Sequence, residues 1–135
     1  MPEKNKSERL GYFEEELRKQ KEKLNFHKEH IETLENSIKF QRNEIKYNKS
    51  WIKFHKGSIL KHERQVKEAE DDSERADQIK KLTFHMEQIK NHHNTCINYH
   101  KREISYAMEW IKLNKKALSE CNSQIKFLEN KIASL

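Results

Sequence analysis

Residues 31–66, IETLENSIKFQRNEIKYNKSWIKFHKGSILKHERQV, carry an aliphatic residue at every seventh position. The same spacing extends back toward the start of the chain. We label these aliphatic positions a and the mixed positions three residues later d. The a positions are Leu10, Leu17, Leu24, Ile31, Ile38, Ile45, Ile52, Ile59 and Val66, and the d positions are Phe13, Gln20, His27, Leu34, Gln41, Asn48, His55, His62 and Ala69. A sustained seven-residue apolar period is typical of a left-handed coiled coil, so this half predicts one long helix.

The second half of the chain repeats the pattern in a different phase. Its a positions are Ile97, Ile104, Ile111, Leu118, Ile125 and Ile132, and its d positions are Ile79, Met86, His93, His100, Ala107, Asn114, Cys121, Leu128 and Leu135. The phase breaks within residues 70–75, where no apolar residue occurs and Asp71 with Glu74 resembles a helix-capping box. An overwound single helix is the alternative reading of such a break.

Composition indicates long helices with few places for the chain to reverse. Pro2 is the only proline and there are two glycines, while 37% of residues are charged and 33% hydrophobic. Because proline and glycine, which interrupt helices, are rare, few turns are expected. A narrow apolar seam between long helices fits the high charged fraction and the modest hydrophobic fraction. We therefore expect an all-α fold, a long antiparallel two-helix coiled-coil hairpin forming one domain of residues 1–135. Its first helix spans about 5–70, its turn about 71–74 and its second helix about 75–134.

An antiparallel pair brings a positions of one helix against d positions of the other. In the predicted register almost every polar seam residue meets an aliphatic one, as His93 meets Ile52, His100 meets Ile45 and Asn114 meets Ile31. The two exceptions are His62 with Thr83 and His55 with Lys90.

A second apolar stripe runs beside the seam at positions c and g. Its densest part consists of Phe40, Tyr47, Trp51, Phe54, Tyr99, Tyr106 and Trp110. An apolar face of this size predicts an interface. Two hairpins packing these faces together as a homodimeric four-helix bundle is the favoured interpretation, and docking of a different protein or a ligand is the other.

The b and e positions form a basic ridge instead. It consists of Lys39, Arg42, Lys46, Lys49, Lys53, Lys56, Lys101, Lys112 and Lys115. Residues 39–67 hold nine Lys or Arg against two acids. Such a row of cations suits a phosphate backbone, although a solvated lysine-rich face is common in coiled coils.

Histidines and cysteines are the remaining candidates for chemistry. Five of the eight histidines stand at d positions, where burial lowers the pKa of the imidazole, so stability should fall as the pH drops below about 6.5. His92, Cys96 and His100 share one helical face at spacings of four, but this is no recognised zinc motif, and seam histidines satisfied by neighbouring side chains or by water are favoured.

These patterns predict no metal site, no cofactor and no enzyme, since glycine-rich phosphate loops, nucleophile elbows and metal-binding motifs are all absent from the sequence. Neither a membrane span nor a signal-peptide core is present, and the unpaired spacing of Cys96 and Cys121 indicates a reducing, cytoplasmic setting. We expect a non-catalytic, self-associating coiled-coil protein that acts by protein binding, as an adaptor, inhibitor or scaffold component. The alternative is a nucleic-acid-binding helical-hairpin dimer that uses the basic ridge.

Overall fold

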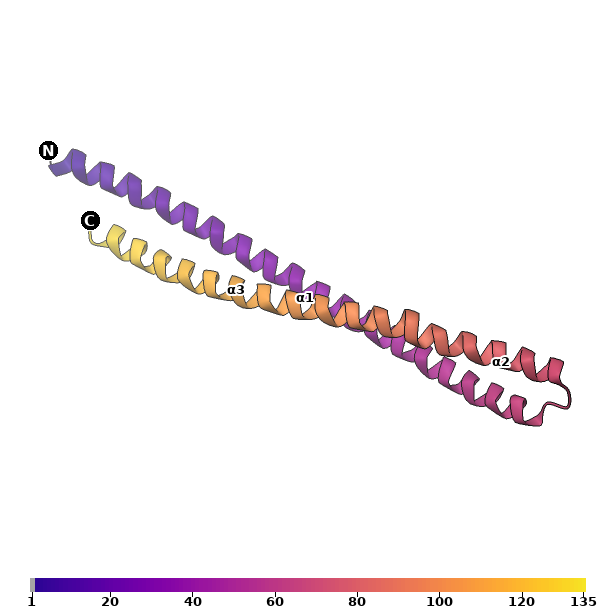
Figure 1. The fold of residues 1–135 in the computed structure, drawn as a ribbon. Coiled ribbons are helices and arrows are strands. Elements are labelled where there is room, and N and C mark those ends of the chain that lie inside the picture. Colours follow the sequence, from indigo (N-terminus) through magenta and orange to yellow (C-terminus); the bar gives the residue numbers. More distant parts are fainter. Residues whose placement is uncertain (1) are drawn as a thin grey trace. The chain divides into compact units, whose positions relative to one another are not determined.

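The computed structural model describes residues 2–135; Met1, where the predicted domain begins, lies outside the described residues. The elements are α1 (Pro2–Glu68), α2 (Asp72–Glu87), a π-helix η1 (Gln88–His93) and α3 (Asn94–Ala133) (Figure 1). Helices make up 96% of the structure, and no strand occurs among residues 2–135. The predicted all-α class is confirmed, as are two helices that pack against each other.

The chain reverses between α1 and α2, where the loss of apolar residues predicted a turn. Asp71 is the N-cap of α2, and its carboxylate accepts a hydrogen bond from the backbone N–H of Glu74 at 2.7 Å. Asp72 and Glu74 place negative charge in the first turn of α2, where it interacts favourably with the helix dipole. The cap predicted at Asp71 is therefore confirmed, and α1 ends and α2 begins on either side of residues 69–71.

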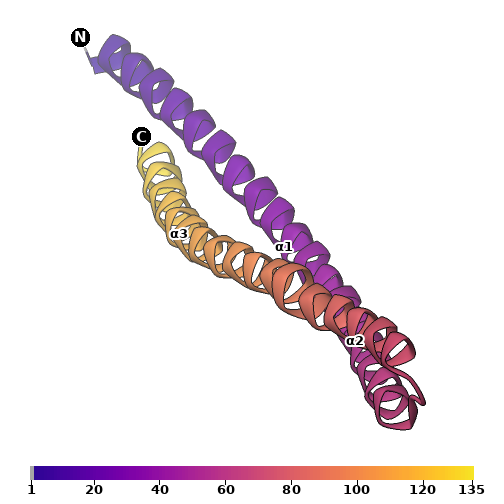
Figure 2. The same ribbon diagram turned by 45° about the vertical axis from the view of Figure 1, so that its right-hand side comes forward.

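The helices form two compact units, and each of them is an antiparallel helix pair. We call residues 38–105 the turn unit, because it contains the end of α1, the turn, α2, η1 and the start of α3. In the turn unit α1 and α2 lie side by side in both ribbon views (Figures 1 and 2). Residues 1–37 with 106–135 make the terminal unit, which pairs the start of α1 with the rest of α3.

Burial follows the predicted heptads of α1 and α3. Every buried residue of the described chain occupies a predicted a or d position. They are Ile38, Gln41, Asn48, His55, Ala69, His93, Ile97, Ala107, Asn114, Cys121 and Leu128. Polar residues are nearly as frequent in this core as apolar ones, so the seam needs hydrogen bonds as well as hydrophobic contact.

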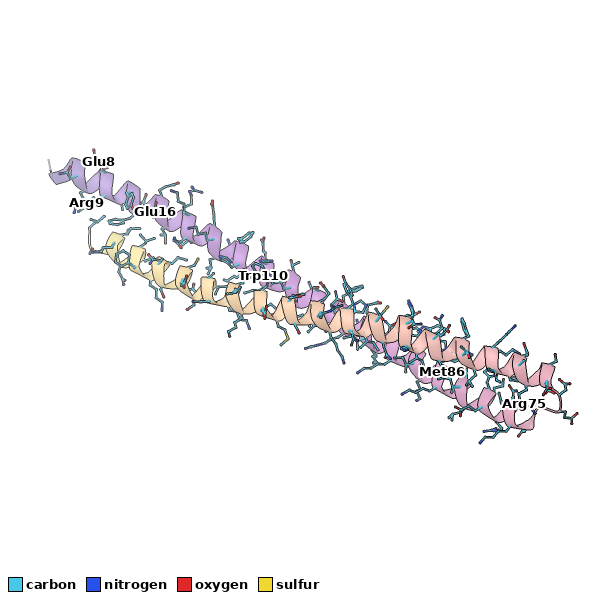
Figure 3. The ribbon with its side chains drawn as sticks, in the orientation of Figure 1. Glu8, Arg9, Glu16, Arg75, Met86 and Trp110 are labelled. Carbon is cyan, nitrogen blue, oxygen red and sulfur yellow. The ribbon has the colours of Figure 1, made fainter. Side chains whose placement is uncertain are left out.

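The predicted seam is wrong between the turn and His93. Ile79 and Met86, assigned to d, are 45% and 54% exposed, and Met86 is labelled on α2 in Figure 3. The half-buried positions of α2 and η1 are instead Gln78, Leu82, His85, Gln88 and Ile89. The expected pairs of His62 with Thr83 and His55 with Lys90 are replaced by hydrogen bonds from His62 to Gln78 and between His55 and His85.

The π-helix η1 accounts for this one-residue displacement. Seven residues of α1 separate the seam partners Asn48 and His55, whereas eight residues separate their partners His93 and His85. A π-turn bonds each N–H to the carbonyl five residues earlier and so accommodates one residue more than an α-turn. The extra residue therefore changes the phase of the second helix inside η1 rather than wholly at the turn.

Deleting Asn91, an exposed residue of η1, should convert this π-turn into ordinary α-helix and be tolerated. The deletion places residues 78, 82, 85 and 89 in the same heptad phase as the following core. We expect unchanged helicity by circular dichroism and no fall in melting temperature.

Deleting Lys116, which is exposed in α3 outside any π-turn, is the matched control. It should shift the heptad phase of the following residues and lower the melting temperature, because core side chains are turned toward water. Equal destabilisation by both deletions would contradict the assignment of the extra residue to η1.

Candidate interaction surfaces and the polar seam

The turn unit is held along its seam by hydrogen bonds between histidine and amide side chains. His93 donates its Nδ1–H to Oδ1 of Asn48 at 2.9 Å, and both residues are buried. The same Asn48 donates its Nδ2–H to the backbone carbonyl of Glu44 at 2.9 Å, which fixes the amide with its oxygen toward His93. Asn48 therefore joins α1 to η1 and has both ends of its amide satisfied.

Two further histidines of the turn unit use the same chemistry. His100 of α3 donates Nδ1–H to Oε1 of Gln41 on α1. His62 of α1 donates Nδ1–H to Oε1 of Gln78 on α2 at 2.7 Å and lies 3.0 Å from Oε1 of Gln65. Because the acceptor is an amide oxygen in each case, the histidine nitrogen that faces it carries the proton.

The terminal unit repeats this arrangement with one amide and two rings. His27 and His30 of α1 donate their Nδ1–H groups to Oδ1 of Asn114 on α3, at 2.7 and 3.3 Å. Asn114 is buried, and its Nδ2–H donates to the backbone carbonyl of Trp110 at 2.8 Å. The amide orientation is therefore fixed in the same way as that of Asn48.

The hydrogen bonds confirm the interpretation that seam histidines are satisfied by neighbouring side chains. Among the residues whose side chains the structure describes, no buried side-chain nitrogen or oxygen lacks a partner. Sequence pairing placed an aliphatic residue opposite almost every polar one and missed the polar partner about one turn further along. His93, for example, lies beside the α1 turn that contains Ile52, between its partner Asn48 and the ring of His55 at 5.2 Å.

A cluster of histidines and aromatic rings lies where α1 meets α2 and η1. The Nδ1 atoms of His55 and His85 are 2.7 Å apart, and the ring of His62 stacks on His85 with centroids 5.5 Å apart. Trp51 stacks on His93 at 6.2 Å with the rings almost parallel. His85 and its neighbour Phe84 were not predicted as site residues, although Leu82 and Ile89, seven apart with His85 between them, carry the signal in the sequence.

Burial lowers the pKa of two of these imidazoles. The pKa of His85 falls below its usual value because of desolvation first and the nearby His55 and His62 second. The pKa of His93 is lowered by desolvation and then by His92 and His55. Both shifts disfavour the charged ring in the seam.

The predicted aromatic face of the turn unit is exposed. Phe40, Tyr47 and Phe54 are each more than half exposed and Trp51 is 39% exposed, all on α1. Trp51 packs edge-on against both Tyr47 and Phe54, with ring centroids 6.3 and 5.6 Å apart. Tyr99 on α3 is exposed as well, although no ring contact joins it to these four among the described residues. We call Phe40, Tyr47, Trp51 and Phe54 the α1 aromatic row.

An open groove of about 430 Å³ extends from this row to the second helix. Its lining combines aromatic rings with polar seam residues, so a group entering it would meet both. The lining residues are Tyr47, Asn48, Trp51, Phe54, His55, Phe84, His85, Gln88, His92 and His93.

The other two predicted aromatic residues, Tyr106 and Trp110, belong to the terminal unit. Both are more than half exposed, and Trp110 is labelled in Figure 3. The indole of Trp110 lies 6.4 Å from the ring of His30, so it covers one edge of the Asn114 site. Further exposed apolar residues of this unit are Tyr12, Phe26, Met108, Leu113 and Phe127.

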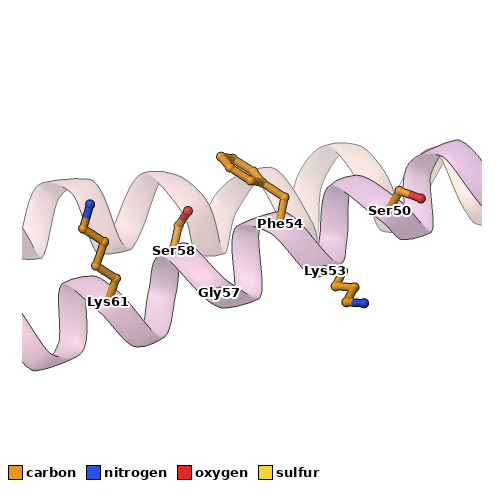
Figure 4. A pocket seen from close by; sticks show the side chains of 6 residues that line it. All are labelled: Ser50, Lys53, Phe54, Gly57, Ser58 and Lys61. Atoms are coloured by element: carbon orange, nitrogen blue, oxygen red, sulfur yellow. The ribbon is translucent and has the colours of Figure 1, made fainter.

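All nine residues of the predicted basic ridge are exposed. Those from Lys39 to Lys56, with Lys101, belong to the turn unit, and Lys112 and Lys115 belong to the terminal unit. None of the nine makes an ion pair with a side chain that the structure describes. In Figure 4 Lys53 and Phe54 point to opposite sides of α1, beside an open groove lined by Ser50, Lys53, Phe54, Gly57, Ser58 and Lys61. Lys53 of the ridge and Phe54 of the α1 aromatic row therefore lie on different sides of α1.

The candidate zinc ligands His92, Cys96 and His100 do not form a metal site. Within residues 2–135, no three His, Cys, Asp or Glu side chains are grouped so that they could hold a metal ion. The free thiols are those of the half-buried Cys96 and the buried Cys121.

Comparisons with protein-family models, with curated proteins and with solved structures give no match to this chain. None of the described helices combines the length and the hydropathy that a membrane span requires.

Replacing Asn48 by leucine should destabilise the protein, because the buried Nδ1–H of His93 then has no acceptor. A buried donor without a partner costs about 1–3 kcal/mol, so urea unfolding should give a lower free energy by that amount. Adding His93→Leu should recover most of the loss, since both polar groups are then replaced by apolar ones. A double variant as unstable as Asn48→Leu alone would contradict the assigned hydrogen bond.

Proposed function

We propose that this chain is a non-catalytic, self-associating coiled-coil protein that acts by binding proteins, as an adaptor, an inhibitor or a component of a scaffold. The observation that carries the proposal is the α1 aromatic row. Four large rings follow one another along a single helix of the turn unit, and three of them are more than half exposed. Contiguous aromatic surface of this kind marks interaction sites rather than ordinary solvated surface.

A second copy of the chain is the occupant that we propose for this row. Each turn unit offers two helices, so two copies that pack their aromatic rows together form a four-helix bundle with the polar seams inside each pair. A two-fold contact of identical surfaces requires self-complementarity, and rings without charge satisfy this without like-charge repulsion. Lys53 of the ridge points away from Phe54 in Figure 4 and remains outside such a contact.

The two free thiols support a cytoplasmic setting for this proposal. Thiols persist in reducing compartments, whereas secreted chains generally pair them. As an adaptor or scaffold, the homodimer binds other proteins through the surface that remains exposed after self-association.

The double variant Phe40→Glu/Tyr47→Glu should be monomeric. Neither ring contacts α2, η1 or α3 in the described aromatic pairs, so the helix pair itself should keep its circular dichroism spectrum and its melting should remain cooperative. We expect light scattering with size exclusion to give a dimer for the original chain and a monomer for the variant, because four buried carboxylates oppose association.

Lys39→Glu/Lys46→Glu is the matched control, since each change lies one residue before an aromatic position. It should leave the dimer intact. An original chain that is monomeric at high micromolar concentration would overturn the proposed self-association, as would a control that dissociates as readily as the aromatic variant.

A second candidate function, nucleic-acid binding by a helical-hairpin dimer, is favoured by the basic ridge. Six of its cations recur every three or four residues from Lys39 to Lys56, all of them exposed and without a described ion-pair partner. Neighbouring cations on one helix face stand about 5–6 Å apart, close to the spacing of phosphates along a strand.

An electrophoretic shift with duplex DNA and with RNA at about 50 mM and about 200 mM salt tests this alternative. Ridge binding predicts a complex that weakens steeply with salt, because each neutralised phosphate releases counterions. The Lys39→Glu/Lys46→Glu variant should form no complex. The Phe40→Glu/Tyr47→Glu variant should still form one, and that complex should weaken with salt as it does for the original chain. No complex at the lower salt concentration excludes nucleic acid as a partner of the ridge.

A further inference from the structure

The hydrogen bond between His55 and His85 differs from every other hydrogen bond that a seam histidine makes across the described helices. His27, His30, His62, His93 and His100 each face the oxygen of an asparagine or glutamine side chain. Such an oxygen accepts from Nδ1–H whether the ring is neutral or positively charged, so protonation at Nε2 preserves the hydrogen bond. His55 and His85 instead face each other, Nδ1 to Nδ1, at 2.7 Å.

The pair can take up one added proton and keep its hydrogen bond, but it cannot take up two. At 2.7 Å one Nδ1 must donate and the other must accept, so the two facing nitrogens share one hydrogen, whichever of the two rings is the donor. A first added proton can enter the donor ring at Nε2 and strengthens the bond. A second added proton must occupy the accepting Nδ1, which removes the acceptor and leaves two cations in contact.

The surroundings oppose that second charge. His62 lies on α1 against His85, and His93 and His92 of η1 lie on the other side of His55. Burial lowers the pKa of both His85 and His93, and the charged neighbours that contribute to these shifts are all histidines, with no carboxylate among them. None of the ion pairs among the described side chains places a carboxylate against one of these rings.

We propose that the His55–His85 pair is a proton-operated switch that separates α1 from α2 in the turn unit when the pair takes up its second proton. The folded pair takes up its second proton less readily than free histidine does, because that proton removes the hydrogen-bond acceptor. Burial and then the neighbouring His55 and His62 hold the pKa of His85 below its usual value of about 6.5. The pair's contribution to stability is therefore complete above about pH 6.5 and is lost as the pH falls from there toward the lower folded pKa. The loss begins at residues 52–62 and 78–89, since these flank the pair. This inference holds whether or not the chain associates with a second copy.

Hydrogen–deuterium exchange at about pH 7.5 and about pH 5.5, corrected for intrinsic exchange, tests the switch. In the original chain, amides of residues 52–62 and 78–89 should exchange at least about tenfold faster at the acidic pH. His85→Gln gives His55 an amide oxygen like those of the other seam histidines. It should abolish most of that acceleration.

His100→Gln is the matched control, because it also removes one imidazole from the turn unit but from a histidine–amide pair. It should leave the acid response in place. The proposal is overturned if His85→Gln responds to acid like the original chain, or if His100→Gln suppresses the response equally.

An NMR titration of the original chain keeps the test independent of how well these variants fold. The two rings should titrate in two separate steps, because the protonation of one ring opposes that of the other. A single common step for His55 and His85 near pH 6.5 would show that they do not share a proton.

Discussion

Hydrogen bonds between histidine rings and carboxamide side chains are the constraint on which each helix pair depends. His93 with Asn48 in the turn unit and His27 with Asn114 in the terminal unit join helices across a seam that apolar residues only partly fill. Buried polar groups stabilise little in net terms but cost much when left unpaired. The seam therefore tolerates one alignment of the helices, because a slip by one turn separates donors from acceptors at several positions at once.

The same constraint explains why the second helix contains a π-turn. Between the turn and His85 the seam follows one heptad phase, and from His93 onward it follows another. A residue too many in a continuous α-helix would rotate either His85 or His93 away from α1. By absorbing that residue, η1 keeps both of them in the seam. One turn of π-helix is what keeps both polar contacts in place.

Much of this fold could be predicted from the sequence, because the seven-residue period and the acidic break near Asp71 are both local signals. The positions of the exposed rings on α1 follow from the same period. The phase between residues 76 and 90 could not be found by extending the heptads backward from Ile97, since an inserted residue leaves no compositional mark. Polar partners such as His93 and Asn48 were missed for another reason: they lie in neighbouring layers, and reading each layer separately pairs them with aliphatic residues.

The tautomers of the seam histidines test the account most directly. Long-range ¹H–¹⁵N NMR spectra at neutral pH report which ring nitrogen carries the proton. The structure requires the proton on Nδ1 in His27, His93 and His100, and opposite tautomers in His55 and His85. Free histidine in water prefers the tautomer that is protonated at Nε2 alone. If all of these rings adopted that tautomer, they would face solvent instead of carboxamide oxygens or the partner ring, and the polar seam would have to be abandoned.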